Sequence, residues 1–148
     1  GTHHAKDANA LFATMNLDLN LFSSAMIVNS QYMHVVWFNL KVKEATSKEK
    51  VIKLFRDNDR IALTEHMSAN EIFSFGRDQG IYGRILNQTV VVESTINVKN
   101  GNEICGFCFT PQDGNSLLSS IAATIRFLNP HSFQDKINNL LPFFYDRI

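Results

Sequence analysis

The stretch QTVVVESTINVKNGNEICGFCFT, residues 88–110, decides the fold of this chain. Two runs rich in β-branched and aromatic residues flank Asn100–Gly101. An Asn-Gly pair between such runs is the strongest short signal for a hairpin turn. The stretch therefore predicts two antiparallel strands joined by a tight turn.

A further strand is predicted earlier in the chain, in YMHVVWFNLKVK, residues 32–43. Its even positions are Tyr32, His34, Val36, Phe38, Leu40 and Val42, and its odd positions turn polar through Asn39, Lys41 and Lys43. This alternation predicts that the even face lies in the core and that the odd face meets water. LDLNLFSSAMIVN, residues 17–29, and RIALT, residues 60–64, also read as strands.

Helices are predicted around these strands from their apolar stripes. The first begins near His4 and carries the stripe Ala8, Leu11, Phe12 and Met15. Two more open with capping boxes, formed by Thr46 with Glu49 and by Ser68 with Glu71. The helix after Thr46 carries the stripe Val51, Leu54 and Phe55.

The last two predicted helices follow residue 116. The first contains Leu117 to Leu128 and ends at Asn129–Pro130. The second runs from about Phe133 with Ser132 as its cap, and its apolar positions are Ile137, Leu140, Leu141 and Phe144. Together the elements predict an α+β fold, a two-layer antiparallel or mixed sheet packed against helices, in a single domain over residues 1–148.

Composition excludes several classes of function. Lys and Arg number 14, as do Asp and Glu, so the chain has no net charge and no electrostatic signature of a nucleic-acid or membrane-surface protein. No apolar run reaches the length of a membrane span, and no signal peptide is visible. We therefore expect a cytoplasmic protein. The first residue is Gly, which suggests a portion of a longer chain.

The two cysteines, Cys105 and Cys108, have the Cys-x-x-Cys spacing of some redox and zinc sites. They fall in a strand-like run, where residues three apart point to opposite faces. Redox pairs usually open a helix, and a zinc site needs two more ligands. The favoured interpretation is two ordinary strand cysteines, and no metal site is expected.

Three histidines are the first candidates for chemistry. His3 and His4 lie at the start of a predicted helix, where free N–H groups and the helix dipole favour an anion. By pattern alone, two solvent-exposed terminal histidines are the simpler interpretation. His34 lies on the predicted apolar face, and it is either a hydrogen-bonded core histidine or a general base at the mouth of a site. Composition alone favours the core histidine.

Two loops are the other candidates. TPQDGNS, residues 110–116, is either a turn with a helix cap or a ligand-binding loop at a strand end. Arg84, in YGRILNQ, is either an anion ligand or an ordinary loop arginine. No dinucleotide-binding or P-loop pattern and no complete catalytic arrangement appears in the sequence.

Five segments, taken in order, resemble the catalytic domain of the type II (archaeal-type) glyceraldehyde-3-phosphate dehydrogenases. They are THHAKDANALF, YMHVVWFNLKVK, VIKLFRDNDRIAL, FGRDQGIYGRILNQTVVVESTINVKNGNEI and TPQDGNSLLSSIAATIR. The resemblance extends from Thr2 to about Phe127. It implies the C-terminal catalytic portion of a phosphorylating aldehyde dehydrogenase of glycolysis or gluconeogenesis, which uses NAD or NADP and forms homo-oligomers.

The resemblance also implies roles for individual residues. The family's paired histidines, associated with phosphate, match His3 and His4, and Arg84 is a further candidate for holding phosphate. The family's Met-His-x-His strand matches MHVV, so the catalytic base maps to His34, whereas Val36 stands where the family has its second histidine. The loop near the nicotinamide matches Gln112, Asp113 and Asn115.

The chain departs from the family in what it lacks. The family's Rossmann-type nucleotide domain and its Cys-Asn-Thr-Thr nucleophile segment both precede the part that this sequence matches. We therefore expect the isolated chain to be inactive and to bind no cofactor alone. Its expected partners are a small phosphorylated aldehyde, inorganic phosphate and the missing N-terminal domain. The alternative hypothesis is a non-catalytic oligomerisation or interaction module, which would dimerise through the outer sheet face that carries Trp37.

Overall fold

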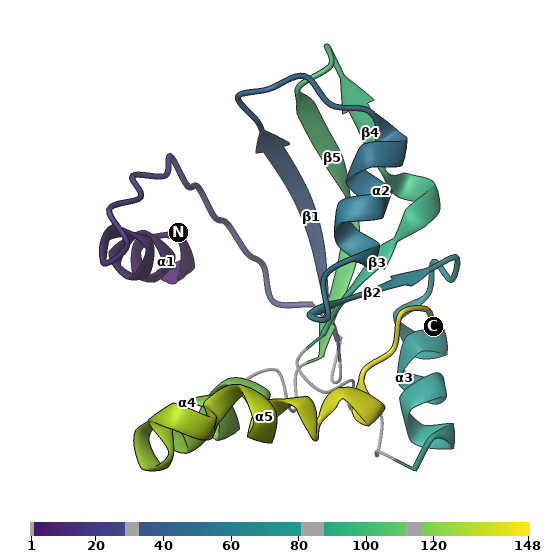
Figure 1. The fold of residues 1–148 in the computed structure, drawn as a ribbon. Helices are drawn as coiled ribbons and strands as arrows, with labels where there is room; N and C mark the ends of the chain where they lie inside the picture. The colour runs from purple at the N-terminus through teal and green to yellow at the C-terminus, as the bar shows by residue number, and fades with distance from the viewer. Residues whose placement is uncertain (1, 29–32, 81–87, 112–116) are drawn as a thin grey trace.

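The computed structural model describes residues 2–28, 33–80, 88–111 and 117–148. Helices and strands alternate along it, and a strand-rich central part is followed by helices (Figure 1). The α-helices are α1 (His4–Ala13), α2 (Lys48–Arg56), α3 (Ala69–Asp78), α4 (Leu117–Leu128) and α5 (Phe133–Asn138). The strands are β1 (Met33–Lys41), β2 (Ile61–Thr64), β3 (Thr89–Val92), β4 (Asn97–Lys99) and β5 (Glu103–Pro111). Three short 3-10 turns are η1 (Glu93–Thr95), η2 (Pro130–Ser132) and η3 (Leu141–Phe143).

The five strands form one mixed sheet in the order β1-β5-β3-β2, with β4 beside β5. β5 is antiparallel to β1, β3 and β4, whereas β2 and β3 are parallel. The predicted α+β fold with a mixed sheet against helices is confirmed.

The Asn100–Gly101 hairpin forms as predicted and joins β4 to β5. Asn100 and Gly101 have φ angles of 51° and 73°, the left-handed conformation that a type I′ turn needs at both central positions. The run before the turn is not one strand, however. Thr95 Oγ1 donates to the Val92 carbonyl at 2.8 Å and accepts from the Phe107 amide at 2.9 Å, so η1 separates β3 from β4.

Two apolar clusters lie on opposite faces of the sheet, because neighbouring strand residues point to opposite sides. On one face, Val51 of α2 packs with strand residues that include Leu63, Val91, Ile104 and Cys108. On the other, Ile72 of α3 packs with strand residues that include Met33, Ala62, Val90 and Phe109. We call these the α2 face and the α3 face.

The starts of α2 and α3 differ in detail from the predicted capping boxes. Ser47, not Thr46, is the N-cap of α2, and its side chain accepts a hydrogen bond from the Lys50 amide. Ser68 is the N-cap of α3, but its side chain makes no capping hydrogen bond. In the predicted stripe of α2, Leu54 is exposed, because the helix turns Val51 and Phe55 toward the sheet.

The side chains of β1 are more exposed than the alternation in the sequence predicts. His34, Val36 and Leu40 are exposed, Phe38 is partly buried, and only Met33, on the odd side, is fully buried. The reason is position, because β1 is the edge strand of the sheet. Phe38 is partly covered by α2, where its ring meets Phe55 edge-to-face with ring centroids 6.2 Å apart.

Residues 17–28 form no strand, contrary to the prediction for this stretch. They lead from α1 to β1 without lying beside the sheet, and α1 itself stands apart from the rest of the fold (Figure 1). α1 begins at His4 as predicted, yet none of its residues is buried.

The C-terminal residues lie along the outer edge of β2. The Leu63 amide donates to the Asp146 carbonyl at 3.0 Å, and the Ile148 amide donates to the Leu63 carbonyl at 2.8 Å. The last helix is shorter than predicted. The predicted apolar stripe extends to Phe144, but α5 ends at Asn138 and η3 follows it. None of the described helices is long and apolar enough to cross a membrane.

Candidate functional site

His3 and His4 lie together at the start of α1. Their ring centroids are 4.6 Å apart at an interplanar angle of 59°, and both side chains are exposed. His3 is the N-cap residue and its side chain makes no capping hydrogen bond, so its ring is not committed to the helix backbone. Two adjacent imidazoles at a helix start can act as donors to an anion.

Asp7 and Ser23 lie beside the two histidines, and neither was a candidate from the sequence. Asp7 Oδ2 lies 3.7 Å from His3 Nε2, one helical turn along α1. Ser23 Oγ accepts from the Ala5 amide at 3.0 Å and lies 2.7 Å from Thr2 Oγ1. The Ala5 amide is therefore already used, so an anion here would depend on the imidazoles together with other donors of the first turn, and the Asp7 carboxylate would oppose its approach. The spacing of four residues could have indicated Asp7, whereas Ser23 becomes a neighbour only through the path of the chain.

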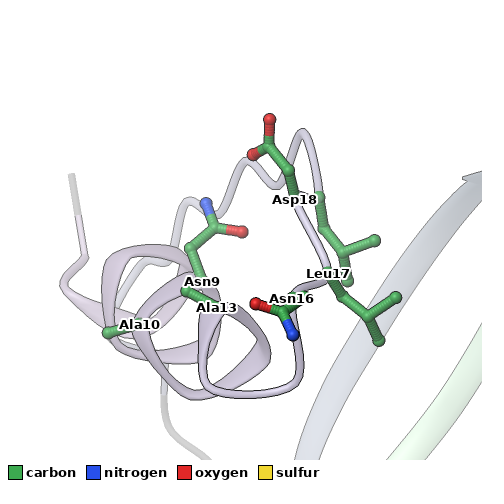
Figure 2. Close-up of a pocket in the computed structure, with 7 residues that line it drawn as sticks. Asn9, Ala10, Ala13, Asn16, Leu17 and Asp18 are labelled. Atoms are coloured by element: carbon green, nitrogen blue, oxygen red, sulfur yellow. The ribbon is translucent and has the colours of Figure 1, made fainter.

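Figure 2 shows a hollow between α1 and the turn after it. Asn9, Asn16 and Asp18 contribute its polar side chains. The side-chain oxygen of Asn9, Oδ1, is buried and has no hydrogen-bond partner among the described residues. His3 and His4 do not line this hollow, so it is separate from the histidine pair.

His34 lies at the start of β1, opposite Thr110 of β5. Its side chain is exposed on the α2 face, so the core-histidine interpretation is wrong. Val36, two residues further on the same face, is 39% exposed. The structure does not bring His34 to the His3–His4 pair, because α1 stands away from the sheet (Figure 1).

The strand register places His34 at the end of the sheet where β5 ends and β3 begins. β5 ends at Pro111, next to Thr110, the partner of His34. β3 begins at Thr89, one residue before Val90, which pairs with Phe109 of β5. Arg84, Gln112, Asp113 and Asn115 lie outside the described residues.

The cysteines behave as ordinary strand residues. Cys105 and Cys108 are both unpaired thiols on β5, three positions apart and therefore on opposite faces. Burial raises the pKa of the Cys108 thiol to about 11, which disfavours a thiolate at neutral pH. Within the described ranges no group of three or more His, Cys, Asp or Glu side chains could hold a metal ion.

No protein-family profile matches the chain. It is similar to the glyceraldehyde-3-phosphate dehydrogenases of Metallosphaera sedula, at 32% identity over 107 residues, and Sulfolobus acidocaldarius, at 32% over 108. Both matches cover 70% of this chain and 30% of the relative. The enzyme of Methanoregula boonei is 25% identical over 126 residues, which is 82% of this chain and 35% of that protein. The chain thus spans about a third of the length of these relatives, and over 70–82% of its own length it is homologous to archaeal glyceraldehyde-3-phosphate dehydrogenases.

Proposed function

We propose that residues 1–148 are the C-terminal catalytic portion of a longer, NAD- or NADP-dependent, phosphorylating aldehyde dehydrogenase. The similarity to archaeal glyceraldehyde-3-phosphate dehydrogenases carries this proposal, because it covers 70% of the chain but only 30% of the relatives. The substrates would be a small phosphorylated aldehyde and inorganic phosphate, in the cytoplasm. The nucleophile and the nucleotide-binding domain would come from the part of the longer protein that precedes this chain.

In this proposal His3, His4 and Arg84 hold phosphate. The adjacent, exposed imidazoles at the start of α1 support the role of the two histidines. Each can donate a hydrogen bond to a phosphate oxygen, and a protonated ring adds charge to that bond. The Asp7 carboxylate, 3.7 Å from His3 Nε2, would weaken this binding by repelling the anion.

His34 is the proposed general base. Its exposed position at the end of the sheet supports this role, because a base must be reachable by substrate. Its neutral ring would accept a proton from the reacting group. Val36 leaves no second imidazole at the family's other histidine position on this strand face. Gln112, Asp113 and Asn115 would face the nicotinamide end of the cofactor, which supplies hydride transfer when bound.

The proposal is tested on the longer protein encoded by the gene, by following reduction of NAD and NADP with a phosphorylated aldehyde and phosphate. We expect activity in the longer protein, none in residues 1–148 alone, and a loss of about 100-fold or more in kcat for His34→Gln. An upstream sequence without a nucleotide-binding pattern or a nucleophilic cysteine would contradict it.

A second candidate function is self-association through the α3 face of β1 and β5. Val35 and Trp37 are 57% and 58% exposed there, and Phe107, paired with Trp37, is 44% exposed. Three exposed apolar residues on one flat face are typical of an interface between subunits. This candidate requires no nucleophile, and sedimentation analysis separates it from a strict monomer.

A further inference from the structure

Residues 17–28 have the sequence of a buried strand but are placed as an exposed segment. Leu17, Leu19 and Leu21 alternate with polar residues, and an apolar run follows. Phe22 is 90% exposed and Ile27 104% exposed. The exposed large apolar residues of the segment are Leu17, Leu21, Phe22, Met26, Ile27 and Val28.

The described residues leave most of this segment uncovered, since only Leu19 and Ser23 in it are partly buried. α1, which precedes it, buries no residue. Two hydrogen bonds join α1 to the segment: the Leu17 amide donates to the Phe12 carbonyl at 3.1 Å, and the Ala5 amide donates to Ser23 Oγ at 3.0 Å. α1 lies apart from the sheet, and residues 17–28 lead from it to the start of β1 (Figure 1). A folded domain rarely leaves so many large apolar side chains of one short segment in water, which points to a partner that covers them.

We propose that residues 17–28 pair as a strand with the polypeptide that precedes residue 1 in the longer protein. This inference rests on the proposed function and names the place where the missing part docks. The matched relatives have about two thirds of their length outside the region that this chain covers. Because the segment lies near the start of the chain, the preceding polypeptide is held close to it at high effective concentration, which favours it over a second copy.

Hydrogen exchange with mass spectrometry tests the proposal on the longer protein and on residues 1–148. We expect amides of residues 22–28 to exchange at least about 100-fold more slowly in the longer protein. Phe22→Asp in the longer protein should remove most of that protection. Phe127→Asp is the matched control, since Phe127 is 87% exposed at the end of α4, and it should leave the protection unchanged.

Three results would overturn the proposal. They are fast exchange of residues 22–28 in the longer protein, protection in residues 1–148 that rises with protein concentration, and a gene with no coding sequence before residue 1. The second result would assign the segment to a second copy of the chain. The assay of aldehyde oxidation is independent: an inactive longer protein with protected residues 22–28 would refute the proposed function but not this docking.

Discussion

Gln88 holds Tyr145 by both atoms of its side-chain amide. Gln88 Nε2 donates to the Tyr145 carbonyl at 2.9 Å, and Gln88 Oε1 accepts from the Tyr145 amide at 3.0 Å. Nε2 also donates to the Asp59 carbonyl at 3.0 Å, and Gln88 is only 1% exposed. One buried side chain thus fixes the C-terminal residues beside β2.

Gln88→Ala should therefore destabilise the domain strongly. It leaves three backbone groups without their partner in a buried place, for which we expect a loss of about 2–4 kcal/mol in the free energy of unfolding. Urea denaturation measures this loss. Gln134→Ala is the control, because Gln134 makes an exposed hydrogen bond to Asn138 and should change stability by less than about 0.5 kcal/mol. Equal effects of the two substitutions would contradict the role of Gln88.

Gly106 is required by the packing of Phe38 across the β1–β5 pair. A Cβ at residue 106 would lie 2.9 Å from Cζ of Phe38. Gly106→Ala should cost about 1–3 kcal/mol of stability, because the ring has to leave its contact with Phe55. A double-mutant cycle with Phe38→Leu checks the cause: the cost of Gly106→Ala should fall in the Phe38→Leu background, and strict additivity would exclude this explanation.

The Cys108 thiol should make stability depend on pH in the alkaline range. Its pKa is raised by burial from an unperturbed 9.0 to about 11 in the folded protein. The folded state therefore keeps the thiol proton up to a higher pH than the unfolded state does. The thiol's contribution is complete below pH 9, and it is lost as pH rises toward 11.

The comparison is between the wild-type chain and Cys108→Val. From pH 8 to pH 10, the wild type should lose about 1 kcal/mol more of its free energy of unfolding than the variant. Cys105→Val is the control, and it should follow the wild type. Parallel pH profiles for wild type and Cys108→Val would contradict the prediction.

The sequence predicted the elements more reliably than their burial. Asn100–Gly101 specified the hairpin because turn chemistry is local. α1 and α4 followed from their periodicity, and α3 followed from the Ser68–Glu71 pattern at its start. The exposure of Val36 and the lack of a strand over residues 17–28 could not be predicted, since both depend on which neighbour covers a segment. Alternation shows that a strand has two faces, but it does not show whether that strand lies at an edge.

The candidate site was predictable to a similar degree. The position of His3 and His4 at a helix start followed from local pattern. Their separation from His34 did not, because it depends on the path of residues 17–28 between α1 and β1. The contact of Ser23 with Ala5 spans 18 residues, and no local signal encodes it.

The exposed apolar residues of β1 and β5 predict concentration-dependent self-association. Trp37→Ser should shift sedimentation toward the monomer, because it removes the largest side chain of the Val35–Trp37–Phe107 face. Met67→Ser is the control: Met67 is 72% exposed in the segment before α3, away from this face. A wild-type chain that stays monomeric at the highest soluble concentration would exclude the interface.

Phosphate should perturb His3 and His4 selectively if the pair is an anion site. A titration of the chain with inorganic phosphate, followed by NMR of the histidine ring C–H groups, should shift His3 and His4 and leave His131 unchanged. His131 is the control because it is exposed in η2, in the C-terminal helical part of the chain. Equal shifts in all three rings would indicate unspecific ion effects and contradict the site.

Asp7 gives the sharpest test of the same site, because its negative charge and the donor group of His4 should change phosphate affinity in opposite directions when each is removed. His4→Asn should weaken phosphate binding by about 10-fold, since it removes one charge-assisted donor. Asp7→Asn should strengthen binding several-fold, because it removes the carboxylate 3.7 Å from His3 Nε2 and with it the repulsion of the anion. Asp7 also contributes as an acidic residue in the first turn of α1, so circular dichroism should be compared in the same samples. Weaker binding in Asp7→Asn with an intact helix would mean that Asp7 orients the ring of His3, and that this orientation outweighs the charge that Asp7 places beside the phosphate.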